Sequence, residues 1–96
     1  MRVSRALPDF VKWLTVIDQP VRHRVLARIV RAESGNLGDH KMFGAVGEMR
    51  IDFGAGYRVY FTLRGAELIF LLCGGSKKAQ ARDIAAARAL EAGLKD

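Results

Sequence analysis

The chain has 96 residues, half of them hydrophobic, and a formal net charge of +6 from 16 basic and 10 acidic residues. This composition excludes a disordered tail and predicts a single folded domain over residues 1–96. The single cysteine excludes an internal disulfide, and the two histidines, which lie far apart in the sequence, predict no metal site. The lack of a long apolar run or signal peptide predicts a cytoplasmic protein without membrane contact.

The first part of the chain is predicted to be mainly helical. Residues 2–5 are expected to form a short strand, and Pro8 then opens a helix with apolar residues at helical spacing. Asp18 is the expected N-cap of a second helix, which ends at Ser34. Four arginines lie opposite the apolar stripe of this second helix, where we expect a solvated surface that could also dock on the ribosome. They are Arg22, Arg24, Arg28 and Arg31.

The second part of the chain changes to the two-residue period of strands. In chain order we expect a loop at 36–47, strands at 48–53, 57–63 and 68–73, turns at 54–56 and 65–66, and a helix at 77–92. The predicted fold class is therefore α+β. An antiparallel sheet of three to four strands packs on an N-terminal helical hairpin and is followed by a C-terminal helix.

The expected turns also predict which residues face each other across the strands. A three-residue turn at 54–56 places Arg50 opposite Tyr60 and Asp52 opposite Arg58, all on the less apolar face. A two-residue turn at 65–66 places Arg58 opposite Cys73. Two arginines and a tyrosine therefore share one face of the sheet.

Basic side chains are expected to gather at one end of this face. They are Arg50, Arg58, Lys77 and Lys78. Such a cluster suits a polyanion. In RNA cleavage, arginine can neutralise the phosphate, a crowded lysine can transfer a proton, and Tyr57 or Tyr60 can stack on a base or donate a proton.

The alternative is that these charges form surface salt bridges. Arg50 would pair with Asp52 or Glu48, and Arg58 with Asp52. Glu48 also has the chemistry of a general base. His40 could be an acid or base, although a lone loop histidine is usually solvated.

The apolar residues of the strands leave a further choice open. Tyr60, Ile69 and Leu71 are expected either to form an apolar patch that suits a partner protein or to lie under the C-terminal helix. Cys73 lacks a sequence neighbour that would activate its thiol, so we expect it in the core.

Four ordered motifs carry a family resemblance across nearly the whole chain. They are GNLGD followed by Lys41, the E-x-R-I strand, G-x-GYRVYF, and LL-C-GG-x-K-x-x-Q-x-x-DI. With these motifs the chain resembles the HigB-like addiction module killer toxins of the RelE/ParE superfamily.

The resemblance implies a RelE-like fold and the function of a toxin in a type II toxin–antitoxin system. It implies a ribosome-dependent mRNA endoribonuclease that needs no metal or cofactor and inhibits translation. Its partners would be mRNA, the ribosome and a cognate antitoxin, often a helix-turn-helix protein that brings the pair to operator DNA. The alternatives are a ParE-like inhibitor of DNA gyrase and a non-enzymatic corepressor.

The resemblance also implies roles for individual residues. Arg50 and Arg58 match the strand positions that hold the scissile phosphate, and Lys77 matches the basic residue after the last strand, so these three are the expected catalytic residues. The expected substrate-binding residues are Lys41, Tyr57, Tyr60, Lys78 and Arg82. The strand parity of Tyr57 nevertheless directs it toward the core. The C-terminal helix has no tyrosine, where RelE carries a catalytic one.

Overall fold

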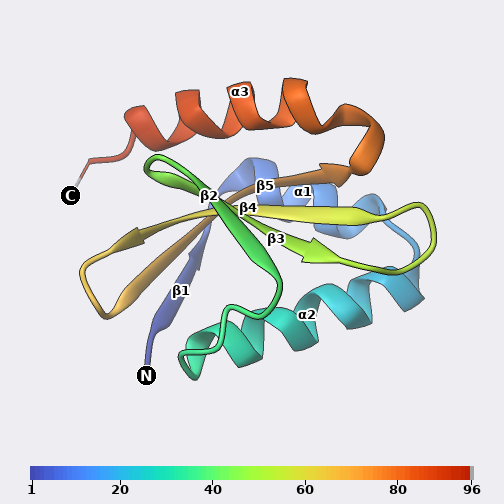
Figure 1. Cartoon of the computed structure of the whole chain (residues 1–96), viewed down its shortest axis with the longest axis horizontal. Helices are drawn as coiled ribbons and strands as arrows, with labels where there is room; N and C mark the ends of the chain where they lie inside the picture. Colours follow the sequence, from blue (N-terminus) through green and yellow to red (C-terminus); the bar gives the residue numbers. More distant parts are fainter. Residues whose placement is uncertain (96) are drawn as a thin grey trace.

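The structure is a computed structural model that describes residues 1–95 (Figure 1). In chain order its elements are β1 (Val3–Ala6), α1 (Pro8–Val16), α2 (Gln19–Glu33), β2 (His40–Phe43), β3 (Val46–Ile51), β4 (Tyr57–Arg64), β5 (Leu68–Ser76), a 3₁₀ turn (Lys77–Ala79) and α3 (Gln80–Ala92). None of the helices in these residues is long and apolar enough to cross a membrane.

The sheet has five strands in the order β1-β5-β4-β3-β2. The α+β class is confirmed, but the expected antiparallel sheet of three to four strands is wrong, because β1 pairs with β5 in parallel. The expected loop at 36–47 is also wrong, because β2 pairs with β3. As an edge strand, β2 has mostly exposed side chains and lacks the apolar alternation by which a strand is predicted.

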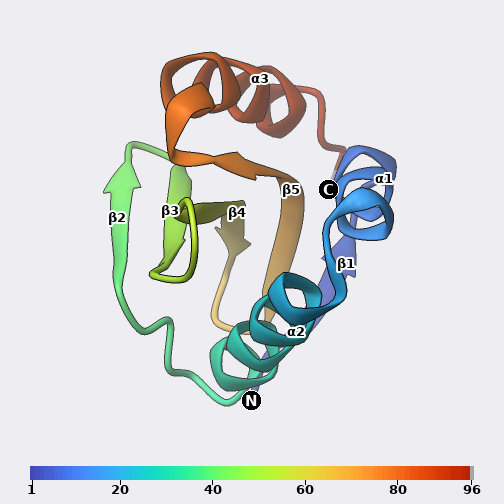
Figure 2. The same ribbon diagram turned by 90° about the vertical axis from the view of Figure 1, so that its right-hand side faces the viewer.

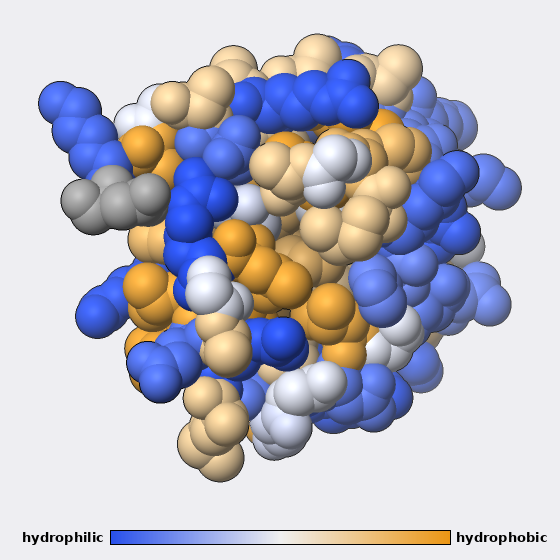
Figure 3. All heavy atoms as spheres, turned by 60° about the vertical axis from the view of Figure 1, so that its left-hand side comes forward, coloured by the Kyte–Doolittle hydropathy of each residue, from blue (hydrophilic) through white to orange (hydrophobic). Residues whose placement is uncertain are grey.

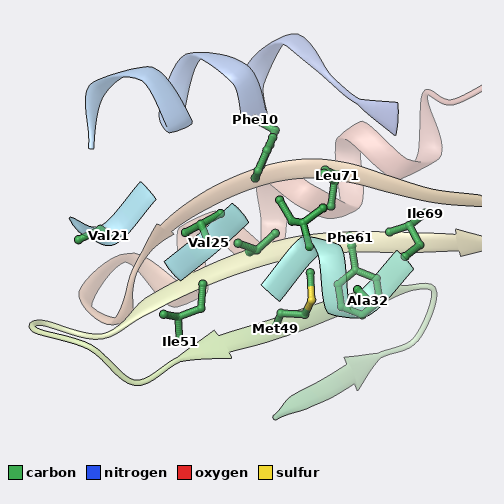
Figure 4. Close-up of a cluster of buried hydrophobic side chains, with 11 residues drawn as sticks. Phe10, Val21, Val25, Ala32, Met49, Ile51, Phe61, Ile69 and Leu71 are labelled. Atoms are coloured by element: carbon green, nitrogen blue, oxygen red, sulfur yellow. The ribbon is translucent and has the colours of Figure 1, made fainter. Parts of the chain in front are cut away.

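Helices cover both faces of the sheet, with α1 and α2 on one side and α3 on the other (Figures 1 and 2). Apolar side chains fill both spaces. Toward α1 and α2 the buried residues are Phe10, Val21, Val25, Ile29, Ala32, Met49, Ile51, Val59, Phe61, Ile69 and Leu71 (Figure 4). Toward α3 they are Val46, Tyr60, Leu72, Cys73 and Ala87.

The turn between α1 and α2 is closed by Arg22. Its Nε donates to the carbonyl oxygen of Leu14 at 2.8 Å and its Nη2 to that of Ile17 at 2.9 Å. These bonds satisfy carbonyl groups at the end of α1 that have no partner within the helix. The expectation of a solvated side chain is therefore wrong for Arg22. Asp18 is the N-cap of α2 as predicted, but its side chain makes no cap hydrogen bond.

The β3–β4 hairpin has a longer turn than predicted. Ile51 lies opposite Tyr57 and Arg50 opposite Arg58, so the register differs by two residues from the prediction of Arg50 opposite Tyr60. The turn runs from 52 to 56 and uses positive φ at Gly54 (58°) and at Gly56 (82°). Because the difference is an even number of residues, every side chain keeps its predicted face.

The β4–β5 hairpin differs from the prediction in two places. Arg64 pairs with Leu68, which makes the turn one residue longer than expected. A bulge then adds one residue to β5, at Leu72, so that Arg58 lies opposite Gly75 instead of Cys73. The first difference reverses the faces of the first half of β5, and the bulge restores them in the second half.

This local reversal removes the expected apolar patch. Ile69 and Leu71 lie in the core under α1 and α2, whereas Tyr60 lies in the core under α3. All three are buried, and Cys73 is a buried core residue as predicted.

Two adjacent glycines let the helices approach both faces of β5. The strand was expected to end at 73, but it continues through Gly74 and Gly75 to Ser76. A Cβ atom at Gly74 would overlap the indole of Trp13 from α1, and one at Gly75 would overlap the carboxylate of Asp83 from α3. The glycines are therefore needed for close packing within a strand.

We expect Gly74→Ala to lower the free energy of unfolding by about 1–3 kcal/mol, because the added methyl group overpacks the contact with Trp13. Urea denaturation measures this change. Gly93→Ala is the matched control, because its Cβ would meet only ordinary contacts at 3.6 Å and its φ is −84°. Equal stability of the two variants would contradict the proposed packing role.

Candidate functional site

A pocket of about 290 Å³ opens beside the β3–β4 turn. It is lined by Asp39, Arg50, Asp52, Gly54, Ala55, Gly56, Arg58 and Lys77. The three residues expected to be catalytic, Arg50, Arg58 and Lys77, thus come together at one place. Their catalytic role stays a prediction. We call this the arginine–lysine pocket.

Two backbone contacts bring the basic side chains together. Arg50 and Arg58 face each other across β3 and β4, so both side chains leave the sheet on the same face. The backbone N–H of Lys77 donates to the carbonyl oxygen of Gly56 at 3.0 Å, which fixes the start of the 3₁₀ turn against the hairpin. A Cβ atom at Gly56 would lie 3.5 Å from that of Lys77.

A buried carboxylate lies behind the two arginines. Glu48 is 0% exposed, and its Oε1 lies 3.1 Å from Nε of Arg50 and 3.7 Å from Nε of Arg58. The longer contact is an ion pair without a hydrogen bond, since Arg58 Nε has no hydrogen-bond partner. Both guanidinium groups therefore contact Glu48 through their Nε atoms. The expected alternative of ion pairing is confirmed for Arg50 with Glu48, but the acceptor is buried and not on the surface.

The second oxygen of Glu48 joins the sheet to α3. Its Oε2 accepts a hydrogen bond from the Tyr60 hydroxyl at 3.1 Å and another from Gln80 Nε2 at 2.9 Å. Burial, together with the neighbouring negative charge of Glu48, raises the pKa of Tyr60. The phenol therefore stays protonated and donates to the carboxylate.

Arg28 of α2 binds the backbone of two residues that line the pocket, Asp39 and Arg50. Its guanidinium group donates to the carbonyl oxygens of Leu37 and Asp39, both at 2.9 Å, and to that of Arg50. Burial, and then the like charge of Arg31, lower the pKa of Arg28. The expectation of a solvated side chain is wrong for Arg28, because its two Nη atoms donate to these three carbonyl groups and its Nε is buried without a hydrogen-bond partner.

Two carboxylates line the pocket beside the three cations. Asp52 was expected to pair with Arg50 or Arg58, yet in residues 1–95 it forms no ion pair, and Asp39 forms none either. The sequence analysis did not propose Asp39 or Gln80 for the site, although Asp39 ends the GNLGD motif and Gln80 lies in the last motif. The arrangement can hold a phosphate between cations and accept a proton on a carboxylate.

The two tyrosines proposed for substrate binding lie outside this pocket. Tyr60 is 0% exposed, so the prediction that it contacts a substrate is wrong, because its ring is covered by α3 and its hydroxyl binds Glu48. Tyr57 packs against the core under α1 and α2, as its strand parity predicts. Neither ring offers a face for base stacking within the pocket.

The other proposed contacts are exposed but do not line the pocket. Lys41 lies on β2 with its Nζ 5.2 Å from the ring centre of Phe43. Lys78 is exposed at the 3₁₀ turn, and Arg82 lies on α3 with its Nε 3.5 Å from Asp83. His40 is exposed on β2 rather than in a loop. In residues 1–95, no group of three or more histidine, cysteine, aspartate or glutamate residues could hold a metal ion.

The fold and the pocket define a small α+β domain with a mixed sheet and a pocket lined by three cations and two carboxylates. No family model matches the chain. The chain is 42% identical over 83 residues to an uncharacterized protein of Haemophilus influenzae, a match that covers 84% of each chain. The chain therefore belongs to the same family as this protein.

We expect Glu48→Gln to lower the free energy of unfolding by about 2 kcal/mol or more, because a neutral amide loses charged hydrogen bonds and leaves the arginines without a counterion. Urea denaturation measures the loss. Asp52→Asn removes an exposed carboxylate of the same pocket and should change stability by about 0.5 kcal/mol or less. A Glu48→Gln variant as stable as Asp52→Asn would show that the buried carboxylate does not hold the site.

Burial, together with the charges of Asp83 and Asp9, raises the pKa of the Cys73 thiol to about 12 from an ordinary value of 9.0. The folded chain thus holds this proton more tightly than the unfolded chain. The resulting stability is complete below about pH 9 and is lost as the pH rises toward 12. We expect unfolding free energies of Cys73→Ala, measured at several pH values in this range, to fall less steeply than those of the wild type. Parallel curves would contradict this assignment.

Proposed function

We propose that this protein is the toxin of a type II toxin–antitoxin system, with a RelE-like fold, and that it cuts mRNA on the ribosome. The observation that carries the proposal is that Arg50, Arg58 and Lys77 line one pocket. These are the residues that the resemblance to HigB-like toxins assigns to catalysis. The reaction would need no metal or cofactor.

The proposed reaction assigns a task to each side chain. Cleavage requires that a 2′-hydroxyl loses a proton, that the five-coordinate phosphate is neutralised, and that the leaving oxygen gains a proton. Arg50 and Arg58 supply the neutralising charge, since Glu48 binds them through Nε and fixes both guanidinium groups. Lys77 protonates the leaving oxygen, and Asp52 or Asp39 accepts the proton of the hydroxyl.

The proposed partner is an acidic antitoxin, a helix-turn-helix protein that would bring the toxin to operator DNA. Its charge would complement the net charge of +6 of this chain. Figure 3 shows apolar side chains gathered on one face of the molecule and surrounded by hydrophilic ones. The exposed large apolar side chains include two on α2, Leu26 at 42% and Val30 at 60%. A partner protein would cover such surfaces.

Lys77→Ala tests the proposal most cleanly, because Lys77 is exposed and forms no ion pair in residues 1–95. Its loss leaves no buried charge unpaired, so the fold should stay intact. We expect induced wild-type protein to produce discrete new 5′ ends in translated mRNA within minutes, measured by primer extension. The variant should reduce this cleavage by roughly 10²-fold or more.

Lys12→Ala on α1 is the matched control, because it removes the same charge from an exposed position away from the pocket. It should cleave like the wild type. Growth arrest with intact mRNA would replace the proposal with gyrase inhibition, and an absence of arrest would replace it with a corepressor role.

A further inference from the structure

A second hollow, of about 220 Å³, lies on the α2 side of the β3–β4 turn. It is lined by Arg24, Ala27, Arg28, Arg31, Ile51 and Asp52. The three arginines stand at positions i, i+4 and i+7 of α2 and therefore share one face of the helix. We call this hollow the α2 arginine groove.

Two of these arginines carry charge that the protein does not neutralise. In the part of the chain that the structure describes, neither Arg24 nor Arg31 forms an ion pair. Arg24 lies over the ring of Phe53, with its Cζ 4.2 Å from the ring centre, and this cation–π contact holds the guanidinium group in place without an anionic partner. Arg28, between them, donates instead to backbone carbonyl groups.

The groove adjoins the arginine–lysine pocket. Asp52 lines both hollows. Arg28 of the groove also donates to the carbonyl oxygens of Arg50 and Asp39, two residues that line the pocket. The two hollows therefore meet at Asp52, and Arg28 is bonded to backbone groups of two residues that line the pocket.

From this continuity we infer that the α2 arginine groove is a second phosphate-binding site, which holds the backbone of the same single RNA strand whose scissile phosphate lies in the arginine–lysine pocket. The inference rests on the proposed function. Arg24 and Arg31 are the phosphate contacts, and Arg28 positions the wall between the sites. Seven residues of helix span about 10 Å, the length of roughly three nucleotides of a stacked strand.

The test compares a dinucleotide with an octanucleotide, both 2′-O-methylated at every position so that cleavage cannot occur. Fluorescence anisotropy measures their binding at several salt concentrations. We expect the wild type to bind the octanucleotide more tightly than the dinucleotide. Arg24→Ala combined with Arg31→Ala should weaken octanucleotide binding on the order of tenfold and leave dinucleotide binding unchanged. The slope of the logarithm of the octanucleotide binding constant against the logarithm of the salt concentration should fall in magnitude by about 0.7 for each lost phosphate contact.

Arg5→Ala combined with Arg88→Ala is the charge-matched control, because both residues are exposed and lie on β1 and α3. An equal loss of octanucleotide binding in the control would overturn the inference. Octanucleotide binding that is no tighter than dinucleotide binding would also overturn the inference. This holds even if the groove variant no longer sedimented with ribosomes, because the groove would then bind an RNA other than the cleaved strand.

These outcomes are separate from a failure of the proposed function. The proposed function would fail if the wild-type protein bound neither probe, or if Lys77→Ala left dinucleotide binding unchanged. Circular dichroism of each variant checks that the fold is retained.

Discussion

The ion pairing of Glu48 is the interaction on which the rest of the site depends. A carboxylate with no solvent exposure is stable in a protein only when charges and hydrogen bonds replace its water. Here the replacements come from β3, β4 and α3, through Arg50, Arg58, Tyr60 and Gln80. One buried charge therefore joins three elements and fixes the direction in which both guanidinium groups leave the sheet.

The net charge of the chain says little about how each arginine is used. Arg22 and Arg28 bind backbone carbonyl groups, and Arg58 is held by Glu48. In residues 1–95, Arg24 and Arg31 form no ion pair, and these two are the arginines of the proposed phosphate site. This division cannot be seen in composition, because all these residues are arginines on helices or strands and differ only in which groups lie within reach.

The sequence predicted the α+β class, the helices and the gathering of Arg50, Arg58 and Lys77. Helical and strand periods, and the alternation of side chains between the two faces of a strand, are local properties that a sequence shows directly. It could not predict the two-residue change in the first hairpin, which depends on the conformation of the turn at 52–56. Nor could it predict the bulge at Leu72 or the parallel pairing of β1, which arise from contacts between distant segments. The role of Glu48 followed from that changed register, which places it opposite Tyr60.

Gly74 and Gly75 have a consequence for how this family can vary. Trp13 packs against one face of β5 at Gly74 and Asp83 against the other face at Gly75, so a shift of the strand away from one of them would bring it into the other. A side chain at one of these positions would fit only if a relative also carried a smaller residue at the position facing it. Aligned relatives should therefore change at 74 together with 13, and at 75 together with 83, as correlated pairs in evolution.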